Sequence, residues 1–398
     1  MRNLIYGQSG GPSSVINASA YGVLDEALKS NDIDHVFIMK HGIDGLIQNA
    51  IVSVDTFKKQ LPLLKHTPSS AFGSVRMKLP DPKVNDELYK KIVHNLKANN
   101  IGFIVYNGGN DSMDTVMKLG RYFKDNDIDI KVLGVPKTVD NDLPETDHTP
   151  GFGSAAKYII NTVMQIKLDS TVYPKGKVTI IEVMGRHAGW LTAASHVASL
   201  SNLGPDLVYL PEHSLSLDQI LNDIKQSYQP NHNCLVVVSE GIKDETGNFF
   251  GSRDAQKDSF GHTQLGGVAS YLAAAVESTL NIKTRVIELS STQRAAAFLR
   301  SKQDVLEAEM VGRTAVKCIQ EGHTSMMVTI KRVSNNPYLV TYNIKDIASI
   351  ANRERCIPKT MLNGLKMHQS FYDYILPLIQ GEEVGNYSQG TQNFFLLK

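Results

Sequence analysis

The chain has 398 residues, and its 41 Lys plus Arg against 40 Asp plus Glu give a formal net charge of +1. This length favours two domains, and the balanced charge excludes a global field that would recruit nucleic acid or an anionic membrane. The three cysteines lie far apart in the sequence, which disfavours a disulfide framework or a cysteine metal site. With no leader-like segment or apolar run of membrane-spanning length, we expect a cytosolic protein.

Short apolar runs of strand length alternate with helical patterns along most of the chain. The predicted strands are NLIY, HVFIM, IGFIVYN, KVLGVP, KVTIIEVM, DLVYLP, NCLVVVSEG and TRVIEL. Helices are expected to begin near Ser14, Asn85, Ser112, Ser154, Gly189, Leu217 and Leu265. This alternation predicts an α/β fold with mostly parallel sheets that carry helices on both faces. The segments MMVTIKRV and PYLVTYNI flank SNNP, which predicts an appended antiparallel pair.

The first strand ends in a glycine-rich loop, IYGQSGGPSS, that contains Gly10 and Gly11. Such a loop before a helix can bind a phosphate. Its spacing matches neither the dinucleotide nor the P-loop motif, so a plain tight turn is the commoner explanation. Arg76, in AFGSVRM, is similarly ambiguous. An arginine can bind phosphate through two hydrogen bonds, but a solvated surface arginine is more usual.

Two later loops, YNGGNDSMDT and GVPKTVDNDLPETD, each follow a predicted strand. Loops at the carboxyl ends of parallel strands form the ligand crevice of such sheets. The first loop has a structural alternative, a turn in which Asp111 caps a helix. The second is harder to explain as a turn, because Lys137 beside Asp140 and Asp142 supplies a cation, a general base and metal affinity together. If Lys137 lies near Asp140, that carboxylate stays ionised at neutral pH.

Three more segments carry polar residues that we expect at the carboxyl ends of strands. They are EVMGR with Arg186, VVVSEG with Glu240, and TRVIELSSTQR with Arg285 and Arg294. Each residue alone has an ordinary surface explanation. Their shared predicted position, at the edge where the sheet forms its crevice, favours a common site.

In order and spacing, the motifs GGNDS, PKTVDND, GFGSA and EVMGR and the two downstream arginines resemble those of the phosphofructokinases, and among these the pyrophosphate-dependent branch. The resemblance runs from Gly10 to about Gly322 and weakens beyond. It implies two doubly wound, Rossmann-like domains with the active site in the cleft between them. The implied division is residues 1–151 plus 296–345 for the phosphoryl-donor domain and residues 152–295 plus 346–398 for the fructose 6-phosphate domain.

The resemblance implies a reversible glycolytic phosphotransferase that moves a phosphoryl group from pyrophosphate to the 1-hydroxyl of fructose 6-phosphate and requires Mg²⁺. Asp140 would remove the hydroxyl proton and Lys137 would stabilise the transferred group, with Thr138 and Asp142 beside them. Implied donor-binding residues are Gly10, Gly11, Arg76, Gly109, Asp111 and Ser112. Implied fructose 6-phosphate residues are Lys177, Met184, Gly185, Arg186, Glu240, Arg285 and Arg294.

Lys177 stands where nucleotide-using relatives place an arginine contributed by a neighbouring subunit, so the resemblance also implies a homodimer or homotetramer. The family usually has a magnesium-associated aspartate where this chain has Asn110. Asp111 or Asp142 would then have to compensate, because Mg²⁺ prefers oxygen ligands and keeps several waters.

Pyrophosphate rather than ATP is the expected donor because of three positions. Asp111 and Thr115 replace smaller residues of the ATP-using members and would narrow the nucleotide space, while Lys137 adds a cation suited to a small, highly charged donor. The nearest alternative is an ATP-dependent 6-phosphofructokinase. A catalytically silent sugar-phosphate-sensing subunit is disfavoured by the retained loop from Lys137 to Asp142, and a lipid or nicotinamide-nucleotide kinase by EVMGR and the downstream arginines.

Overall fold

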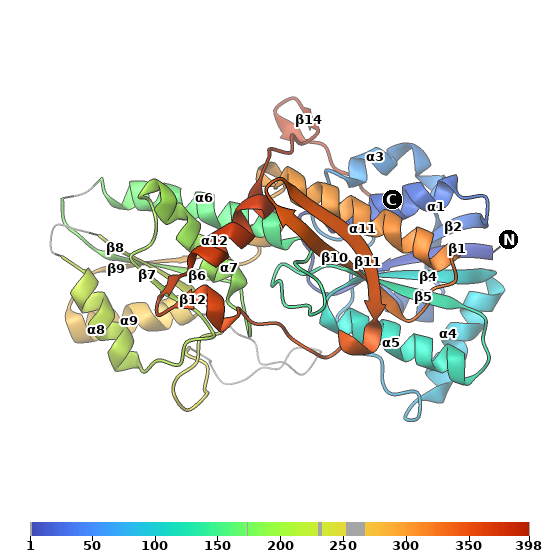
Figure 1. The fold of residues 1–398 in the computed structure, drawn as a ribbon, viewed down its shortest axis with the longest axis horizontal. Helices are drawn as coiled ribbons and strands as arrows, with labels where there is room; N and C mark the ends of the chain where they lie inside the picture. Colours follow the sequence, from blue (N-terminus) through green and yellow to red (C-terminus); the bar gives the residue numbers. More distant parts are fainter. Residues whose placement is uncertain (1, 173, 230–232, 252–266, 398) are drawn as a thin grey trace.

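The computed structural model describes residues 2–172, 174–229, 233–251 and 267–397, which form two lobes, each built around one sheet (Figure 1). The larger lobe holds a sheet in the order β11-β10-β5-β4-β1-β2-β3. Its strands are β1 (Arg2–Gln8), β2 (Ile33–Met39), β3 (Ile51–Ser53), β4 (Ile101–Gly108), β5 (Lys131–Pro136), β10 (Met326–Asn335) and β11 (Tyr338–Asp346). The pairs from β2 to β10 through β1, β4 and β5 are parallel, and β10 and β11 form the predicted antiparallel pair.

Helices cover both faces of this sheet. Leu4 and Tyr6 of β1 pack in one core with α1 (Ile16–Lys29) and α11 (Lys302–Gln320). Ile5, between them, packs in another core with α2 (Ile43–Ile47), α4 (Asp86–Ala98) and α5 (Asn110–Asp125). Because successive strand residues point to opposite faces, a continuous apolar run such as NLIY is what a sheet buried on both sides requires.

The smaller lobe holds a fully parallel sheet in the order β7-β8-β6-β9. Its strands are β6 (Val178–Val183), β7 (Leu207–Tyr209), β8 (Cys234–Ser239) and β9 (Thr284–Glu288). One face packs against α6 (Phe152–Ser170), α7 (Trp190–Ala194) and α12 (Gln369–Ile375), and the other against α8 (Leu217–Ser227) and α9 (Val268–Leu280). The α/β class with mostly parallel sheets and all eight predicted strands are therefore confirmed.

The predicted helix starts agree with the structure to within two residues for α1, α4, α5, α6, α7 and α8, and the start expected near Leu265 lies outside the described residues. Helix α11 is not among the predicted helices. Ser301 caps it by accepting a hydrogen bond from Asp304. It packs closely on α1, since a Cβ on Gly22 would lie 2.1 Å from the carbonyl oxygen of Glu309. This contact explains a glycine inside a helix, where it costs stability.

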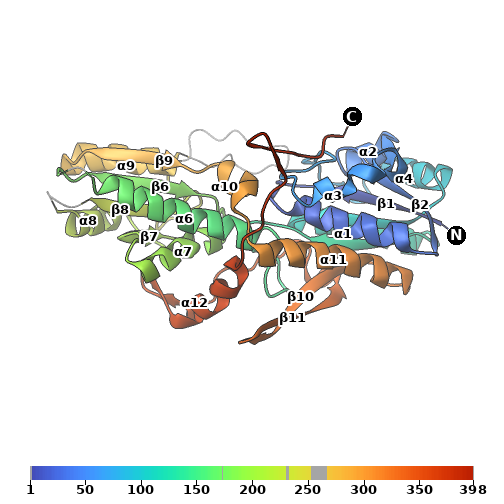
Figure 2. The ribbon, with the colours of Figure 1, turned by 90° about the horizontal axis from the view of Figure 1, so that it is seen from above.

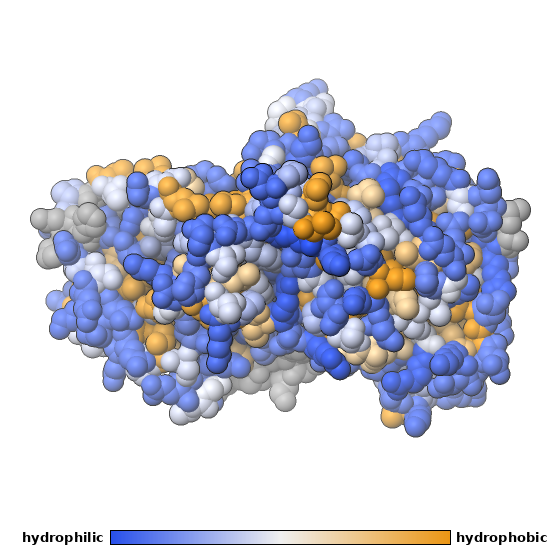
Figure 3. All heavy atoms as spheres, in the orientation of Figure 1, coloured by the Kyte–Doolittle hydropathy of each residue, from blue (hydrophilic) through white to orange (hydrophobic). Residues whose placement is uncertain are grey.

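The chain crosses between the lobes more than once, and its end returns to the larger lobe (Figure 2). Phe395 packs against Phe57 and Phe72, with ring centroids 5.2 and 5.9 Å apart. The exact division of the chain into two domains stays a prediction. On the face seen in Figure 1, apolar residues occur in small groups among hydrophilic ones (Figure 3). No helix in the described parts of the chain is long and apolar enough to cross a membrane.

Candidate active site

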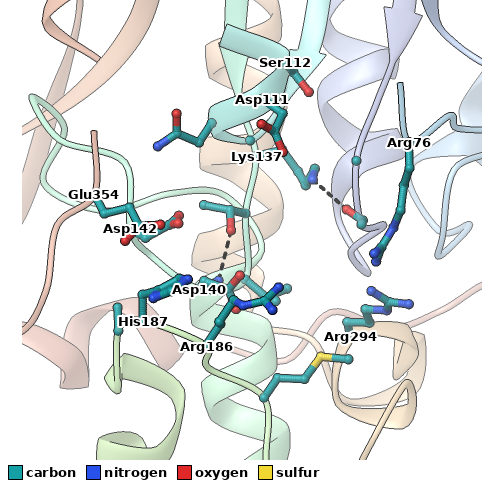
Figure 4. Close-up of a pocket in the computed structure, with 18 of the residues that line it drawn as sticks. Arg76, Asp111, Ser112, Lys137, Asp140, Asp142, Arg186, His187, Arg294 and Glu354 are labelled. Atoms are coloured by element: carbon teal, nitrogen blue, oxygen red, sulfur yellow. Dashed lines mark hydrogen bonds between the residues drawn. The ribbon is translucent and has the colours of Figure 1, made fainter. Parts of the chain in front are cut away.

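A cavity of about 740 Å³ is lined by residues of both lobes (Figure 4). It contains most of the residues that sequence analysis placed in the site, although many positions separate them in the chain. Those that line it are Gly10, Gly11, Arg76, Gly109, Asp111, Ser112, Lys137, Thr138, Asp140, Asp142, Met184, Arg186, Glu240 and Arg294. The carboxyl ends of β1, β4, β5, β6 and β8 lead into the loops that carry nearly all of them, as expected for parallel sheets.

Three cations meet at the glycine-rich loop after β1. The Lys137 ammonium donates a hydrogen bond of 2.5 Å to the Gly11 carbonyl oxygen, and a Cβ on Gly11 would lie 3.0 Å from the Arg294 guanidinium. Arg76 and Arg294 point toward one another in Figure 4. Burial, together with Arg294 and Arg76, lowers the pKa of Lys137 to about 8 despite the opposing carboxylates of Asp140 and Asp142. The three cations repel one another at this place, and binding of a polyanion would reduce that repulsion.

The amino end of α5 forms the neighbouring wall. Gly109 precedes the helix, and Asp111 and Ser112 lie in its first turn. The Lys137 amide donates to the Gly108 carbonyl oxygen at 2.9 Å, which joins this turn to the loop after β5. Thr115 was expected to narrow the nucleotide space, but it is buried within α5, where its hydroxyl donates to the Asp111 carbonyl oxygen. Of the two bulky residues in this helix, Asp111 is the one that lines the cavity.

The loop after β5 carries two carboxylates with unusual pKa values. Burial and the Glu240 carboxylate raise the pKa of Asp140 to about 6, although Lys137 and Arg294 oppose the rise. Burial, Asp140 and Glu354 raise the pKa of Asp142 to about 7. Lys137 lowers the pKa of Asp140, as the sequence suggested, but burial has the larger effect on this pKa. A pKa near 6 still leaves Asp140 mainly ionised at pH 7 and well matched to general-base work.

The smaller lobe contributes the opposite wall. Met184 and Arg186 follow β6, and Glu240 follows β8. Gly185 lies between them with φ of 145°, and its amide donates to Glu240 at 3.4 Å. A Cβ on Gly185 would lie 2.8 Å from the Ala188 carbonyl oxygen. Gly185 thus shapes this wall through its backbone rather than by facing the cavity.

Two predicted fructose 6-phosphate residues lie at the other end of the smaller sheet. Lys177 directly precedes β6, and Arg285 is the second residue of β9, paired with Thr179. The Arg285 guanidinium forms an ion pair with Asp169 at 2.9 Å. The expectation that Arg285 lies at the carboxyl end of its strand is wrong, because β9 begins only one residue earlier. Because a strand rises about 3.3 Å per residue, the full length of the strands separates this edge of the sheet from the cavity.

The cavity also includes residues that sequence analysis missed. Lys78 and His187 come from loops of the two lobes, and Asn352 and Glu354 come from the segment after β11. Glu354 lies beside Asp142 in Figure 4 and raises its pKa. The sequence IANRERCIP gives no motif that marks Glu354, and only the folded chain brings it to the site.

A family model described as phosphofructokinase matches residues 3–319. A pyrophosphate–fructose 6-phosphate 1-phosphotransferase of Halomonas elongata is 38% identical over 98% of this chain and 94% of its own length. An enzyme of the same name from Xanthomonas campestris is 39% identical over 100% of this chain and 96% of its own. The crystal structure of a pyrophosphate-dependent phosphofructokinase from Nitrosospira multiformis superposes with a TM-score of 0.90 at 35% identity, covering 100% of this chain and 96% of that one.

These matches confirm the resemblance that the loop motifs indicated, and they extend it past Gly322 to nearly the whole chain. With the family model spanning most of the sequence and the same two-lobed fold around the cavity, the chain belongs to the phosphofructokinase family.

Proposed function

We propose that the protein transfers a phosphoryl group from pyrophosphate to the 1-hydroxyl of fructose 6-phosphate, releasing phosphate and forming fructose 1,6-bisphosphate reversibly. The observation that carries this proposal is the cluster of Arg76, Lys137 and Arg294 around Gly11, with Asp140 in the same cavity. A cation cluster beside a carboxylate with a pKa near 6 suits transfer between a polyanionic donor and a hydroxyl.

Pyrophosphate is the donor in this proposal because the attractive and repulsive groups both favour a compact polyanion. Lys137 brings a buried cation to the glycine loop. Asp111 places a carboxylate in the wall formed by α5, where a longer nucleotide donor would meet both its bulk and its charge. Relatives such as the Halomonas enzyme carry pyrophosphate in their name, which supports the same choice.

Catalysis rests on positioning, charge stabilisation and one base. Asp140 accepts the proton of the attacking hydroxyl, and Thr138 holds the loop by accepting a hydrogen bond of 3.1 Å from the Asp140 amide. Lys137, Arg76 and Arg294 stabilise the negative charge on the transferred group and on the leaving phosphate. In the reverse direction, the protonated Asp140 returns the proton as the bond to the sugar oxygen breaks.

Mg²⁺ fits the carboxylate side of the cavity. Asp142 Oδ1 is buried and has no hydrogen-bond partner within the described chain, and burial together with the carboxylates of Asp140 and Glu354 raises the pKa of Asp142. Asp142 and Glu354 would hold the ion, which would neutralise charge on the donor. The described residues contain no cluster of three His, Cys, Asp or Glu suited to a metal, so the donor and water would supply the remaining oxygens. Asp111 faces the cavity and stays the weaker candidate ligand.

Fructose 6-phosphate binds against the smaller lobe in this proposal, near Met184, Arg186, Glu240 and Arg294. The resulting division assigns the donor to the larger lobe and the sugar phosphate to the smaller one, in line with the predicted domains. Lys177 and Arg285 lie too far along the sheet to reach the same cavity. We assign them to the sugar 6-phosphate in a neighbouring subunit of a homodimer or homotetramer.

The three cysteines are free thiols, which supports a cytosolic setting for this enzyme. The test is an assay of the purified protein with fructose 6-phosphate and either pyrophosphate or ATP, each with and without Mg²⁺. Formation of fructose 1,6-bisphosphate that requires pyrophosphate and Mg²⁺ is the expected result. Turnover with ATP but not with pyrophosphate would show that ATP is the donor. Binding of fructose 6-phosphate without turnover with either donor would indicate the catalytically silent sensing subunit.

A further inference from the structure

The segment of residues 352–356, here called the bridging segment, follows the larger sheet and runs along the cavity toward the smaller lobe. It lies beyond residue 319, where the match to the family model ends. Two of its side chains, Asn352 and Glu354, line the cavity. The contacts that hold this segment in place therefore decide what the cavity wall presents to a ligand.

Asn110, the first residue of α5, forms hydrogen bonds to the bridging segment through both the nitrogen and the oxygen of its side-chain amide. Its Nδ2 donates to the Arg353 carbonyl oxygen, and its Oδ1 accepts a hydrogen bond of 2.5 Å from the Asn352 amide. An amide can donate and accept in this way, whereas an ionised carboxylate only accepts. The geometry therefore requires asparagine rather than aspartate at this position.

Asn352 strengthens the same attachment from the other side. Its Nδ2 donates to Asp114 Oδ1 at 2.9 Å, and Asp114 is itself fixed by an ion pair of 2.6 Å with Lys118. Asn352 has φ of 60°, a conformation that asparagine adopts more readily than most residues. The segment is thus turned sharply at the point where α5 holds it.

Further along, the bridging segment contacts the loop after β5 and the smaller lobe. The Arg355 amide donates to the Asp142 carbonyl oxygen at 2.7 Å, and its guanidinium donates to the Asp147 carbonyl oxygen at 2.6 Å. The Cys356 thiol donates to the His187 carbonyl oxygen at 3.4 Å. Glu354 is held between these two sets of contacts, which fixes its place beside Asp142.

We propose that Asn110 is a positioning residue of the phosphoryl-transfer site: its amide fastens the bridging segment to α5 and so keeps Asn352 and Glu354 in the cavity wall. The side chain acts through the segment rather than by touching the reactants or a metal. The inference rests on the proposed function for its kinetic readout, while its structural readout needs no activity.

The structural test uses limited trypsin digestion of the ligand-free protein, because Arg353 is exposed and its peptide bond lies in the fastened segment. Asn110→Asp removes the N–H donor and sets a carboxylate against the Arg353 carbonyl oxygen, so cleavage after Arg353 should accelerate by about tenfold. Asn352→Ala loosens the same attachment from the other side and should act in the same direction. The matched control is Asn161→Asp, which removes a 2.8 Å amide bond to the Lys157 carbonyl oxygen within α6 and should leave cleavage after Arg353 unchanged.

The kinetic test uses saturating Mg²⁺ and varies each substrate. Asn110→Asp should raise KM for pyrophosphate about tenfold and leave KM for fructose 6-phosphate within about twofold, since Asn110 holds Asn352 against the first turn of α5, which lines the donor side of the cavity. Unchanged cleavage in both Asn110→Asp and Asn352→Ala would overturn the proposal, as would unaltered or improved KM for pyrophosphate in Asn110→Asp. If the wild-type protein lacks pyrophosphate-dependent activity, the proposed function fails, and the trypsin comparison still decides whether Asn110 fastens the segment.

Discussion

The Lys137 ammonium lies 2.5 Å from the carbonyl oxygen of Gly11, a residue 126 positions earlier in the chain. This contact joins the loop after β5 to the loop after β1 and holds a buried cation where glycine leaves the backbone accessible. Lys137 therefore has two roles: it connects two loops of the cavity wall, and its positive charge is available to a ligand.

Lys137→Gln should lower kcat with pyrophosphate by about 10²-fold or more, because a preorganised charge aimed at the transferred group is lost. Steady-state kinetics with purified variants provide the measurement. Lys131→Gln is the control, since Lys131 begins the same strand and lies at its opposite end. A Lys137→Gln enzyme with near-normal kcat would remove Lys137 from the charge-stabilising role.

Asp140→Asn should lower kcat by roughly 10² to 10⁴ and leave KM for fructose 6-phosphate within a few-fold, as expected when a general base is removed. A kcat above about a tenth of wild type would exclude Asp140 as the base.

The pH profile of the wild-type enzyme should be bell-shaped. Asp140 must be ionised to accept a proton, so kcat/KM should fall as the pH drops through about 6. Lys137 must be protonated, so kcat/KM should fall again as the pH rises through about 8. The charged groups around Asp140 are Glu240, Lys137, Arg294 and Glu354, together with Asp142, whose pKa Asp140 raises. Glu354→Gln should therefore move the acid limb to lower pH, and an acid limb that moves to higher pH would contradict this assignment.

Much of the site could be predicted from the sequence because its residues follow recognisable strands. The motifs PKTVDND and GGND each follow an apolar run of strand length. Because parallel strands end at the same edge of a sheet, this position alone predicts that Lys137 lies near Gly109. Arg285 shows the limit of this rule. The predicted strand TRVIEL begins at Thr284, as β9 does, so Arg285 lies at the amino end of its strand. Of the two downstream arginines, Arg294 follows the strand and lines the cavity.

The remaining features depend on tertiary structure. The pKa of Asp140 is governed first by burial, which the neighbouring Lys137 in the sequence does not reveal. From the sequence, Asn110 is only a replacement for the usual metal-binding aspartate. In the folded chain, its amide forms hydrogen bonds through both its nitrogen and its oxygen to the bridging segment, which lies more than 240 residues later in the chain. Glu354 has no local pattern to mark it, because its position depends on that long-range contact.

Lys177→Ala and Arg285→Ala should each raise KM for fructose 6-phosphate much more than KM for pyrophosphate, if these side chains reach the sugar phosphate of a neighbouring subunit. The exposed Lys283→Ala, on the same sheet edge, is the control. Mixing subunits gives the sharper measurement. A 1:1 refolded mixture of Lys177→Ala and Asp140→Asn should regain up to about a quarter of wild-type activity, because half the chains form mixed dimers with one intact site. A fully active monomer in sedimentation would contradict the shared site.

The stability of the larger lobe should depend on His148. Its ring lies 2.8 Å from Asp147 Oδ1 and 2.6 Å from Glu307 Oε2. Burial alone would lower the pKa of His148, but the two carboxylates outweigh it and raise the pKa to about 9. The pKa of His148 in the folded state exceeds its unfolded value of about 6.5. The contribution of protonated His148 to the free energy of unfolding is therefore complete below pH 6.5 and is lost as the pH rises through 9.

His148→Gln should therefore reduce the free energy of unfolding by about 3 to 5 kcal/mol at pH 6, where Glu307 is left buried without its cation. The loss should shrink by pH 9.5, and urea denaturation at both pH values provides the measurement. His323→Gln is the control, because the His323 side chain is partly exposed, with a relative accessibility of 42%. An equal loss at both pH values would show that packing rather than charge explains the effect.

Asp111→Gly should change donor preference, because Asp111 places bulk and negative charge in the cavity wall at the start of α5. Removing that side chain should let ATP support measurable turnover and raise the ratio of kcat/KM for ATP to that for pyrophosphate. Lys137→Gly is the informative comparison. It removes an attractive charge without clearing the wall formed by α5, so pyrophosphate turnover should collapse with no gain for ATP. An unchanged ratio in Asp111→Gly, or a wild-type enzyme that already prefers ATP, would mean that this loop does not select the donor.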